Sequence, residues 1–174
     1  MVILITGASH AGKTLLAQRM LEAYGYPYLS IDHLKMGLIR SGMTALTVED
    51  DDALTEYLWP IVREIVKTAI ENRQNLIVEG CYVPFDWRSG FDASYLSSIR
   101  FICLAMTDAY LDTHYADVIS RASAIEARPD DSGCTLMRLK EENRKTVAGF
   151  QSANEDVTLI DTDWEQTIQA LLRG

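Results

Sequence analysis

The sequence lacks most features of membrane-spanning, fibrous or disulfide-stapled proteins. No apolar run approaches the ~18 residues that a membrane span needs. There are only three cysteines, an odd number with no Cys-x-x-Cys spacing, which favours free thiols and a reducing, cytoplasmic location. The three histidines are too scattered to predict a metal site, and no repeat or linker divides the chain. Its 174 residues therefore predict about one domain, spanning 1–174.

Basic residues are also in short supply. Sixteen lysines and arginines face 25 aspartates and glutamates, for a formal net charge of -9. Such a surface repels phosphate backbones and anionic lipids, so neither nucleic acid nor a membrane is an expected partner. An anionic small molecule still fits if the bases gather at one site. The apolar run at residues 1–5 has no basic region before it, which favours a first strand over a signal peptide.

Short apolar runs alternate with amphipathic segments. The expected strands are 2–5, 26–31, 76–78, 99–105 and 157–160. The expected helices are 13–24, 32–40, a long one continuing to about residue 70, much of 108–153, and about 164–172. Thr47 and Asp50 have the N-cap and N3 spacing of a start for that long helix. Alternating elements predict a parallel sheet with helices on both faces, in which ligands bind beyond the carboxyl ends of the strands.

One such strand end carries a phosphate-binding motif. Residues 7–14 match G-x-x-x-x-G-K-[ST] in full, after an expected strand and before an expected helix. Glycines let successive N–H groups face one anion, and the helix N-terminus adds unpaired donors. Lys13 supplies a charge for phosphates, and Thr14 offers a hydroxyl to Mg²⁺. The predicted nucleotide-binding residues are Gly7, Ala8, Ser9, His10, Ala11, Gly12, Lys13 and Thr14.

This octapeptide resembles the Walker A motif of P-loop NTPases and kinases, which implies binding of ATP or GTP with Mg²⁺. The Asn-Lys-x-Asp base-reading motif of GTPases does not occur, which favours ATP. The short chain and its order of elements resemble the adenylate-kinase-like superfamily of small-molecule kinases. That resemblance implies a three-layer α/β/α fold with a five-stranded parallel sheet in the order 2-3-1-4-5 and a helical lid at about 115–145.

Carboxylates follow two further strands. Asp32 after the second strand is a candidate base toward a substrate hydroxyl, or alternatively a helix N-cap. Glu79 after the third strand is expected to hold the metal with Thr14. Nucleoside-monophosphate kinases have Gly-Asp-x-x-Arg where this chain has Lys35, which lacks the bidentate fork of arginine. The expected acceptor-binding residues are Lys35, Arg40, Tyr82 and Arg88.

Six bases gather in one window, at Arg121, Arg128, Arg138, Lys140, Arg144 and Lys145. Arginines that close over a transferring phosphoryl group stabilise its charge, and a mobile lid brings them in. Arg121 and Arg128 are the first candidates, and surface ion pairs with neighbouring glutamates are the alternative.

Together these features predict an ATP-dependent kinase of a small hydroxyl-bearing or phosphorylated metabolite. The alternatives are a nucleoside-monophosphate kinase and a slow, nucleotide-binding regulatory or toxin-like module.

Overall fold

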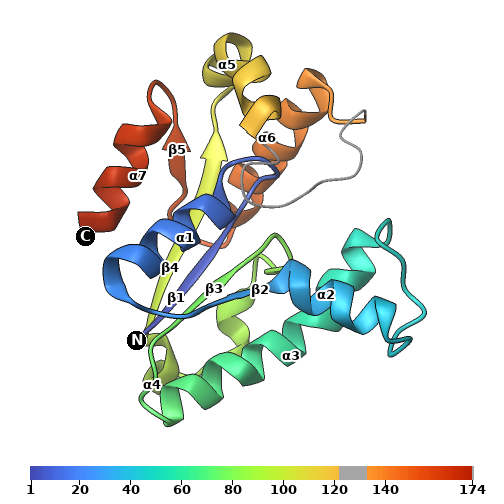
Figure 1. Ribbon diagram of the computed structural model, residues 1–174, viewed down its shortest axis with the longest axis vertical. Helices are drawn as coiled ribbons and strands as arrows, with labels where there is room; N and C mark the ends of the chain where they lie inside the picture. The colour runs from blue at the N-terminus through green and yellow to red at the C-terminus, as the bar shows by residue number, and fades with distance from the viewer. Residues whose placement is uncertain (122–132, 174) are drawn as a thin grey trace.

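The computed structural model describes residues 1–121 and 133–173. Its centre is a five-stranded, all-parallel sheet (Figure 1) in the order β2-β3-β1-β4-β5, which confirms the expected fold class. The strands are β1 (Val2–Gly7), β2 (Tyr28–Ser30), β3 (Leu76–Glu79), β4 (Ile99–Met106) and β5 (Thr158–Ile160). Because β1 lies in the middle, the loop that follows it is flanked by the ends of β3 and β4.

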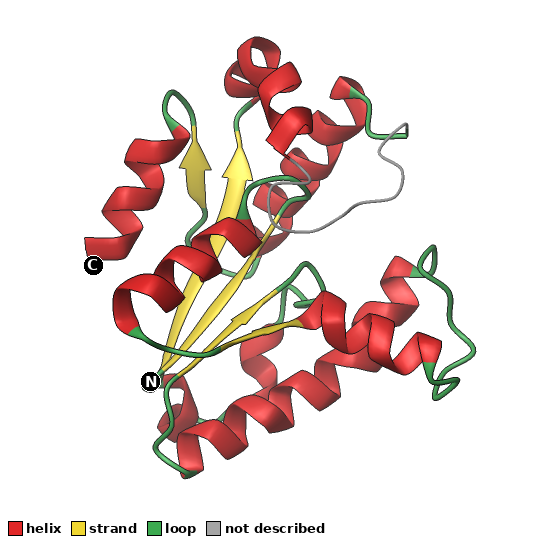
Figure 2. Cartoon of the chain, viewed as in Figure 1, coloured by secondary structure: helices red, strands yellow, loops and turns green. Residues whose placement is uncertain are grey.

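Helices cover both faces of this sheet (Figure 2). They are α1 (Lys13–Tyr24), α2 (Ile31–Arg40), α3 (Asp51–Glu71), α4 (Ala93–Leu96), α5 (Asp108–Arg121), α6 (Leu136–Ser152) and α7 (Trp164–Arg173). A short 3-10 helix, η1 (Trp87–Gly90), lies between β3 and α4. Among them, α1 lies beside α7, and α2 beside α3 (Figure 1).

The all-apolar β1 is buried along its length, as expected for a central parallel strand. Its side chains alternate between two cores. Ile3 and Ile5 pack on the α1 and α7 side, with Leu16 among their neighbours. Val2 and Leu4 pack on the α3 side. Full burial of such side chains contributes roughly 1.5–3 kcal/mol each, so this strand anchors the sheet between its two helical layers.

The start of α3 differs from the expectation. The helix begins at Asp51, with Asp50 as its N-cap, so Thr47 is not the cap. The Thr47 backbone N–H and hydroxyl both donate to Asp50 Oδ2, at 2.7 and 2.9 Å. These bonds hold the pKa of the Asp50 carboxyl below its usual value. The bond from the Thr47 N–H to the Asp50 carboxylate is one half of the expected pair, but it closes the loop before the helix because the helix begins after Asp50.

Two further differences concern boundaries. β2 ends at Ser30, so Asp32 lies in the first turn of α2 and not at the strand end. In the expected lid region, α5 ends at Arg121 and α6 begins at Leu136. Arg128 lies outside the described residues.

Within the described ranges, no helix is both long enough and apolar enough to cross a membrane.

Candidate active site

The loop after β1 is shaped by residues with left-handed backbone angles. Gly7, His10 and Gly12 have φ values of 139°, 63° and 89°. A Cβ on Gly7 would lie 2.0 Å from the carbonyl oxygen of Leu104 on β4, so no larger residue fits there. The next amide, that of Ala8, donates to the same carbonyl at 2.9 Å. The loop is therefore held against β4 by its main chain.

The loop opens directly into α1, whose first amides point out of the helix end. The Leu16 N–H bonds to the Gly12 carbonyl at 2.9 Å, so the amides before Leu16 precede the helical ladder. Such amides and the helix dipole attract anions. Lys13 Nζ donates to the Ala8 carbonyl at 2.8 Å and so lies over the loop it follows. The arrangement suits a phosphate chain bound by main-chain N–H groups and one ammonium.

The two residues expected to hold a metal lie in contact. Thr14 Oγ1 donates to Glu79 Oε2 at 3.2 Å, across 65 residues of sequence. Glu79 ends β3, pairs in register with Ile5 of β1, and is only 1% exposed. A hydroxyl and a carboxylate are oxygen donors of the kind that Mg²⁺ takes, together with phosphate oxygens and water. The residues therefore fit a magnesium ion bound with a nucleotide.

Trp164, at the start of α7, supports the loop from a distant part of the sequence. Its Nε1–H donates to the Ala11 carbonyl at 3.1 Å. A Cβ on Gly12 would lie 2.7 Å from the Trp164 ring. This role could not be predicted from the sequence, because no local motif links a tryptophan near the C-terminus to the loop.

A second missed contact joins the loop to the segment before α6. Cys134 Sγ lies 3.7 Å from His10 Nδ1, and Ser9 Oγ lies 2.8 Å from the same nitrogen. The Cys134 carbonyl accepts a bond from the Tyr115 hydroxyl at 2.7 Å. His10 therefore makes contacts within the protein, including one with Cys134 in the expected lid.

On the β2 and β3 side, four polar side chains form a chain of contacts that we call the Lys35 cluster: Asp32, Lys35, Asp51 and Tyr82. Lys35 Nζ donates to Asp32 Oδ1 at 2.6 Å and to the Tyr82 hydroxyl at 2.9 Å. The Tyr82 hydroxyl donates to Asp51 Oδ1 at 3.1 Å. Tyr82 is buried, and desolvation raises the pKa of its hydroxyl far above the ordinary value. Asp51 was not anticipated from the sequence.

Cys81 lies between this cluster and the phosphate loop. Its thiol is exposed, yet the surrounding protein raises its pKa by desolvation. The charged groups that act on it come from both sides: Lys13, Asp32, Lys35 and Asp51. The segment after β3 joins the two parts of the site, because Glu79 contacts Thr14 of the phosphate loop and Tyr82 contacts Lys35.

The other expected acceptor residues stand apart from the Lys35 cluster. Arg88, in η1, pairs with the buried carboxylate of Glu155, with Nη2 at 3.0 Å from Oε2, and packs on the Trp87 ring. This pairing raises the pKa of the Arg88 guanidinium. Arg40 is the exposed last residue of α2. Neither arginine has a contact with the Lys35 cluster among the described residues.

Most described bases of the expected lid are paired with carboxylates. Arg144 bonds to Asp108, Lys140 Nζ to Asp112 at 2.6 Å, and Arg138 to its helix neighbour Glu142 at 3.0 Å. Arg121 is exposed at the end of α5. The pKa of Glu165 on α7 is lowered mainly by its hydrogen bond from Arg19, with a smaller contribution from the charge of Arg121. Surface pairing thus accounts for three of the five described bases in this window, and Arg121 and Lys145 are the other two.

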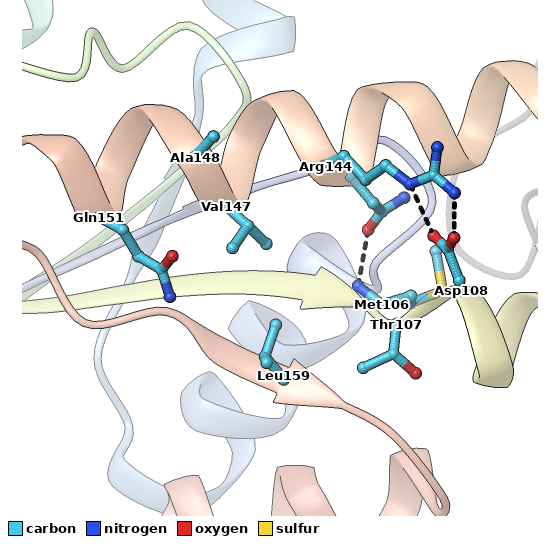
Figure 3. Close-up of a pocket in the computed structure, with 9 residues that line it drawn as sticks. Met106, Thr107, Asp108, Arg144, Val147, Ala148, Gln151 and Leu159 are labelled. Carbon is cyan, nitrogen blue, oxygen red and sulfur yellow. Dashed lines mark hydrogen bonds and ion pairs between the residues drawn. The ribbon is translucent and has the colours of Figure 1, made fainter.

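A cavity of about 320 Å³ lies elsewhere, between α6 and the ends of β4 and β5 (Figure 3). One end is closed by the Asp108–Arg144 pair, and Leu159 of the edge strand lines the other side. The Asn143 side chain accepts the Met106 N–H at 2.6 Å and so ties α6 to β4. No residue of the phosphate loop lines this cavity, so it is separate from the loop site.

Comparisons with known proteins agree with this architecture. No protein-family model matches the chain, and no curated protein matches it in sequence. Solved structures match the chain in fold. A shikimate kinase from Bacteroides thetaiotaomicron has a TM-score of 0.57 and 17% identity, and the match covers 99% of this chain and 97% of that one. A gluconokinase from Sinorhizobium meliloti 1021 has a TM-score of 0.53 and 16% identity, covering 99% and 89%. A sugar kinase from Janibacter sp. HTCC2649 has a TM-score of 0.55 and 15% identity, covering 99% and 92%. The chain therefore has the fold of the P-loop small-molecule kinases.

Proposed function

We propose that this protein is an ATP-dependent phosphotransferase that moves the γ-phosphoryl group of ATP to a hydroxyl group of a small metabolite. The observation that carries the proposal is the Thr14–Glu79 contact at 3.2 Å beside a complete phosphate loop. A buried carboxylate at that point suits the magnesium ion that phosphoryl transfer needs. The fold shared with kinases adds support.

The phosphate loop performs the binding step. The main-chain amides at the start of α1 hold the phosphate oxygens, and Lys13 moves from the Ala8 carbonyl to the β- and γ-phosphates. Thr14 and Glu79 would hold Mg²⁺, which when bound neutralises charge on the phosphates. Binding through main-chain N–H groups does not require long side chains to be ordered, so the loop is preorganised for an anion.

Asp32 is the proposed base. Lys35 occupies its Oδ1, while Oδ2 has no hydrogen-bond partner among residues 1–121 and 133–173. The side chain is 34% exposed, so an acceptor hydroxyl can reach that oxygen. Asp32 then takes the proton as the acceptor oxygen attacks the γ-phosphorus. Lys35 holds the carboxylate in place, and the Tyr82 hydroxyl in turn holds Lys35.

Arg121 and Arg128 are proposed to cover the transferring group from a lid at about 115–145. Arg121 is exposed at the point where α5 ends. An arginine at that place can turn toward charge that develops on the phosphoryl oxygens, and closure would exclude water.

The proposal is tested in two stages. Calorimetry with Mg²⁺ and a nonhydrolysable ATP analogue should show binding that the Lys13→Met substitution weakens strongly. Assays that detect a phosphorylated product from [γ-³²P]ATP then screen hydroxyl compounds. Catalytic phosphorylation of nucleoside monophosphates would replace the proposal with a nucleoside-monophosphate kinase. Binding without transfer to any acceptor would favour a nucleotide-binding regulatory module.

A further inference from the structure

The positive charge of the Lys35 cluster is already neutralised within the protein. Lys35 has a side chain that is only 12% exposed. Its ammonium donates to Asp32 at 2.6 Å and to the Tyr82 hydroxyl at 2.9 Å, and it lies 4.8 Å from the centre of the Tyr82 ring. The Lys35 ammonium therefore already faces a carboxylate and a hydroxyl, and an anionic group of an acceptor that approached its remaining N–H would lie beside the Asp32 carboxylate.

Arginines near this side of the sheet offer no replacement. The Arg88 guanidinium is held by the Glu155 carboxylate, which is 6% exposed. Moving Arg88 toward a substrate would leave that carboxylate buried without its partner, which is unfavourable. Arg63 on α3 is paired with Glu64 at 2.9 Å. Both guanidinium groups are therefore paired with the protein's own carboxylates, and Arg40 lies at the other end of α2, about 12 Å along the helix from Asp32.

Carboxylates, in contrast, are in excess. Asp51 is exposed at the first turn of α3 and is joined to the cluster through Tyr82. Together with Asp32 it outnumbers the single Lys35. Lys13 and Glu79, on the phosphate side, are assigned to the phosphates and Mg²⁺, so the two carboxylates and one ammonium of the Lys35 cluster set the charge toward the acceptor. Like charges at close range repel strongly where water is partly excluded.

We infer that the acceptor is a hydroxyl compound without a carboxylate or phosphate group, either an uncharged polyol or an amino alcohol, and that Asp51 is the residue that favours the amine. The inference rests on the proposed function and narrows its substrate class. A hydroxyl of the acceptor donates to Asp32 Oδ2, while an ammonium group, where present, lies toward Asp51. The same charges disfavour phosphorylated and carboxylated metabolites.

Matched acceptors test the inference directly. Each hydroxyl scaffold is offered in neutral, amine, carboxylate and phosphate form, for example glucose, glucosamine, gluconate and glucose 6-phosphate, with glycerol, serinol, glycerate and glycerol phosphate as a second set. For any scaffold that is phosphorylated, kcat/KM should be at least about tenfold lower for the anionic forms. A carboxylate or phosphate form that exceeds its neutral parent would overturn the inference while leaving the proposed function intact.

The exposed Cys81 thiol gives a readout that does not depend on turnover. Methanethiosulfonate reagents with a trimethylammonium or a sulfonate group report the local potential by their relative rates. Mass spectrometry of the Cys81 peptide measures both rates in the protein without nucleotide, and each rate is divided by that of the same reagent with 2-mercaptoethanol. The normalised rate of the cationic reagent should be at least about twofold higher, and this difference should shrink at high salt. A ratio at or below one refutes the inference.

Two neighbouring substitutions sharpen this readout. Asp51→Asn should lower the ratio of cationic to anionic rates, whereas Asp52→Asn removes the same charge from the next residue and should change it less. With an amine acceptor, Asp51→Asn should raise KM more than it lowers kcat. Equal effects of the two substitutions would remove Asp51 from the site. If the charge preference at Cys81 holds and no hydroxyl compound is phosphorylated, the proposed function fails and the acceptor class falls with it, while the negative potential at Cys81 remains.

Discussion

The phosphate loop and the Lys35 cluster face the same region but are built in different ways. The loop is eight consecutive residues that use mainly the main chain, with left-handed angles at Gly7, His10 and Gly12. The cluster uses side chains from three separate segments, at the start of α2, the start of α3 and the residues after β3. The loop should therefore be sensitive to an added Cβ, and the cluster to the loss of a single polar atom.

The largest effect is expected at Gly7. A Gly7→Ala substitution places a Cβ 2.0 Å from the Leu104 carbonyl oxygen, so β1 and β4 must separate. We expect a loss of more than about 3 kcal/mol of unfolding free energy, or failure to fold, measured by chemical denaturation. Gly37→Ala is the control, because nothing lies within 4 Å of its Cβ and alanine favours the helix by about 1 kcal/mol. A Gly7→Ala protein of normal stability would show that the loop is not held against β4.

Asp32→Asn tests the chemistry of the cluster without breaking the loop. The amide cannot take a proton from the acceptor, so kcat should fall by roughly 10²–10⁴ while ATP affinity stays close to normal. Isothermal calorimetry and product assays measure the two quantities separately. Retention of the parent kcat would remove Asp32 from the role of base and leave it as a partner of Lys35.

Tyr82→Phe removes one oxygen that joins Lys35 to Asp51. The hydroxyl makes bonds of 2.9 and 3.1 Å and lies in a buried side chain, so a loss of about 1 kcal/mol is expected on unfolding. The matched control is Tyr95→Phe, whose hydroxyl bonds to Glu71 at 2.6 Å, in a contact open to solvent, and should matter less. Equal losses of unfolding free energy in the two variants would mean that the buried hydrogen bonds of Tyr82 stabilise the protein no more than the exposed one of Tyr95.

The smallest effect concerns the pH dependence of Cys81. Its raised pKa means that the protonated thiol persists to higher pH than in a free cysteine. Alkylation by iodoacetamide should therefore be slower than for a model thiol at pH 8, and its rate should still rise above the ordinary pKa of about 8.5. The same peptide in urea should titrate normally. A midpoint at or below that ordinary value in the folded protein would contradict the placement of the thiol.

Several features followed from consecutive residues alone. The eight-residue loop, the central β1 strand and the glycine that ends α1 were predictable, because each depends on the backbone preferences and burial of neighbouring residues. Gly25, for example, has a φ of 69° and donates its N–H to the Leu21 carbonyl at 2.8 Å. The strand order followed from the resemblance that this loop supports. Glu79 was predictable because the carboxyl ends of parallel strands lie at one edge.

Tertiary structure alone decided which distant side chains meet. It brought the Tyr82 hydroxyl to Asp51 and the Trp164 indole N–H to the Ala11 carbonyl. It also paired Arg88 with Glu155, where the sequence had predicted a ligand contact. These contacts depend on where helices pack on the sheet, which is set by burial of many apolar side chains at once. A sequence motif specifies angles along the chain, whereas the charge around an acceptor depends on partners brought together by packing.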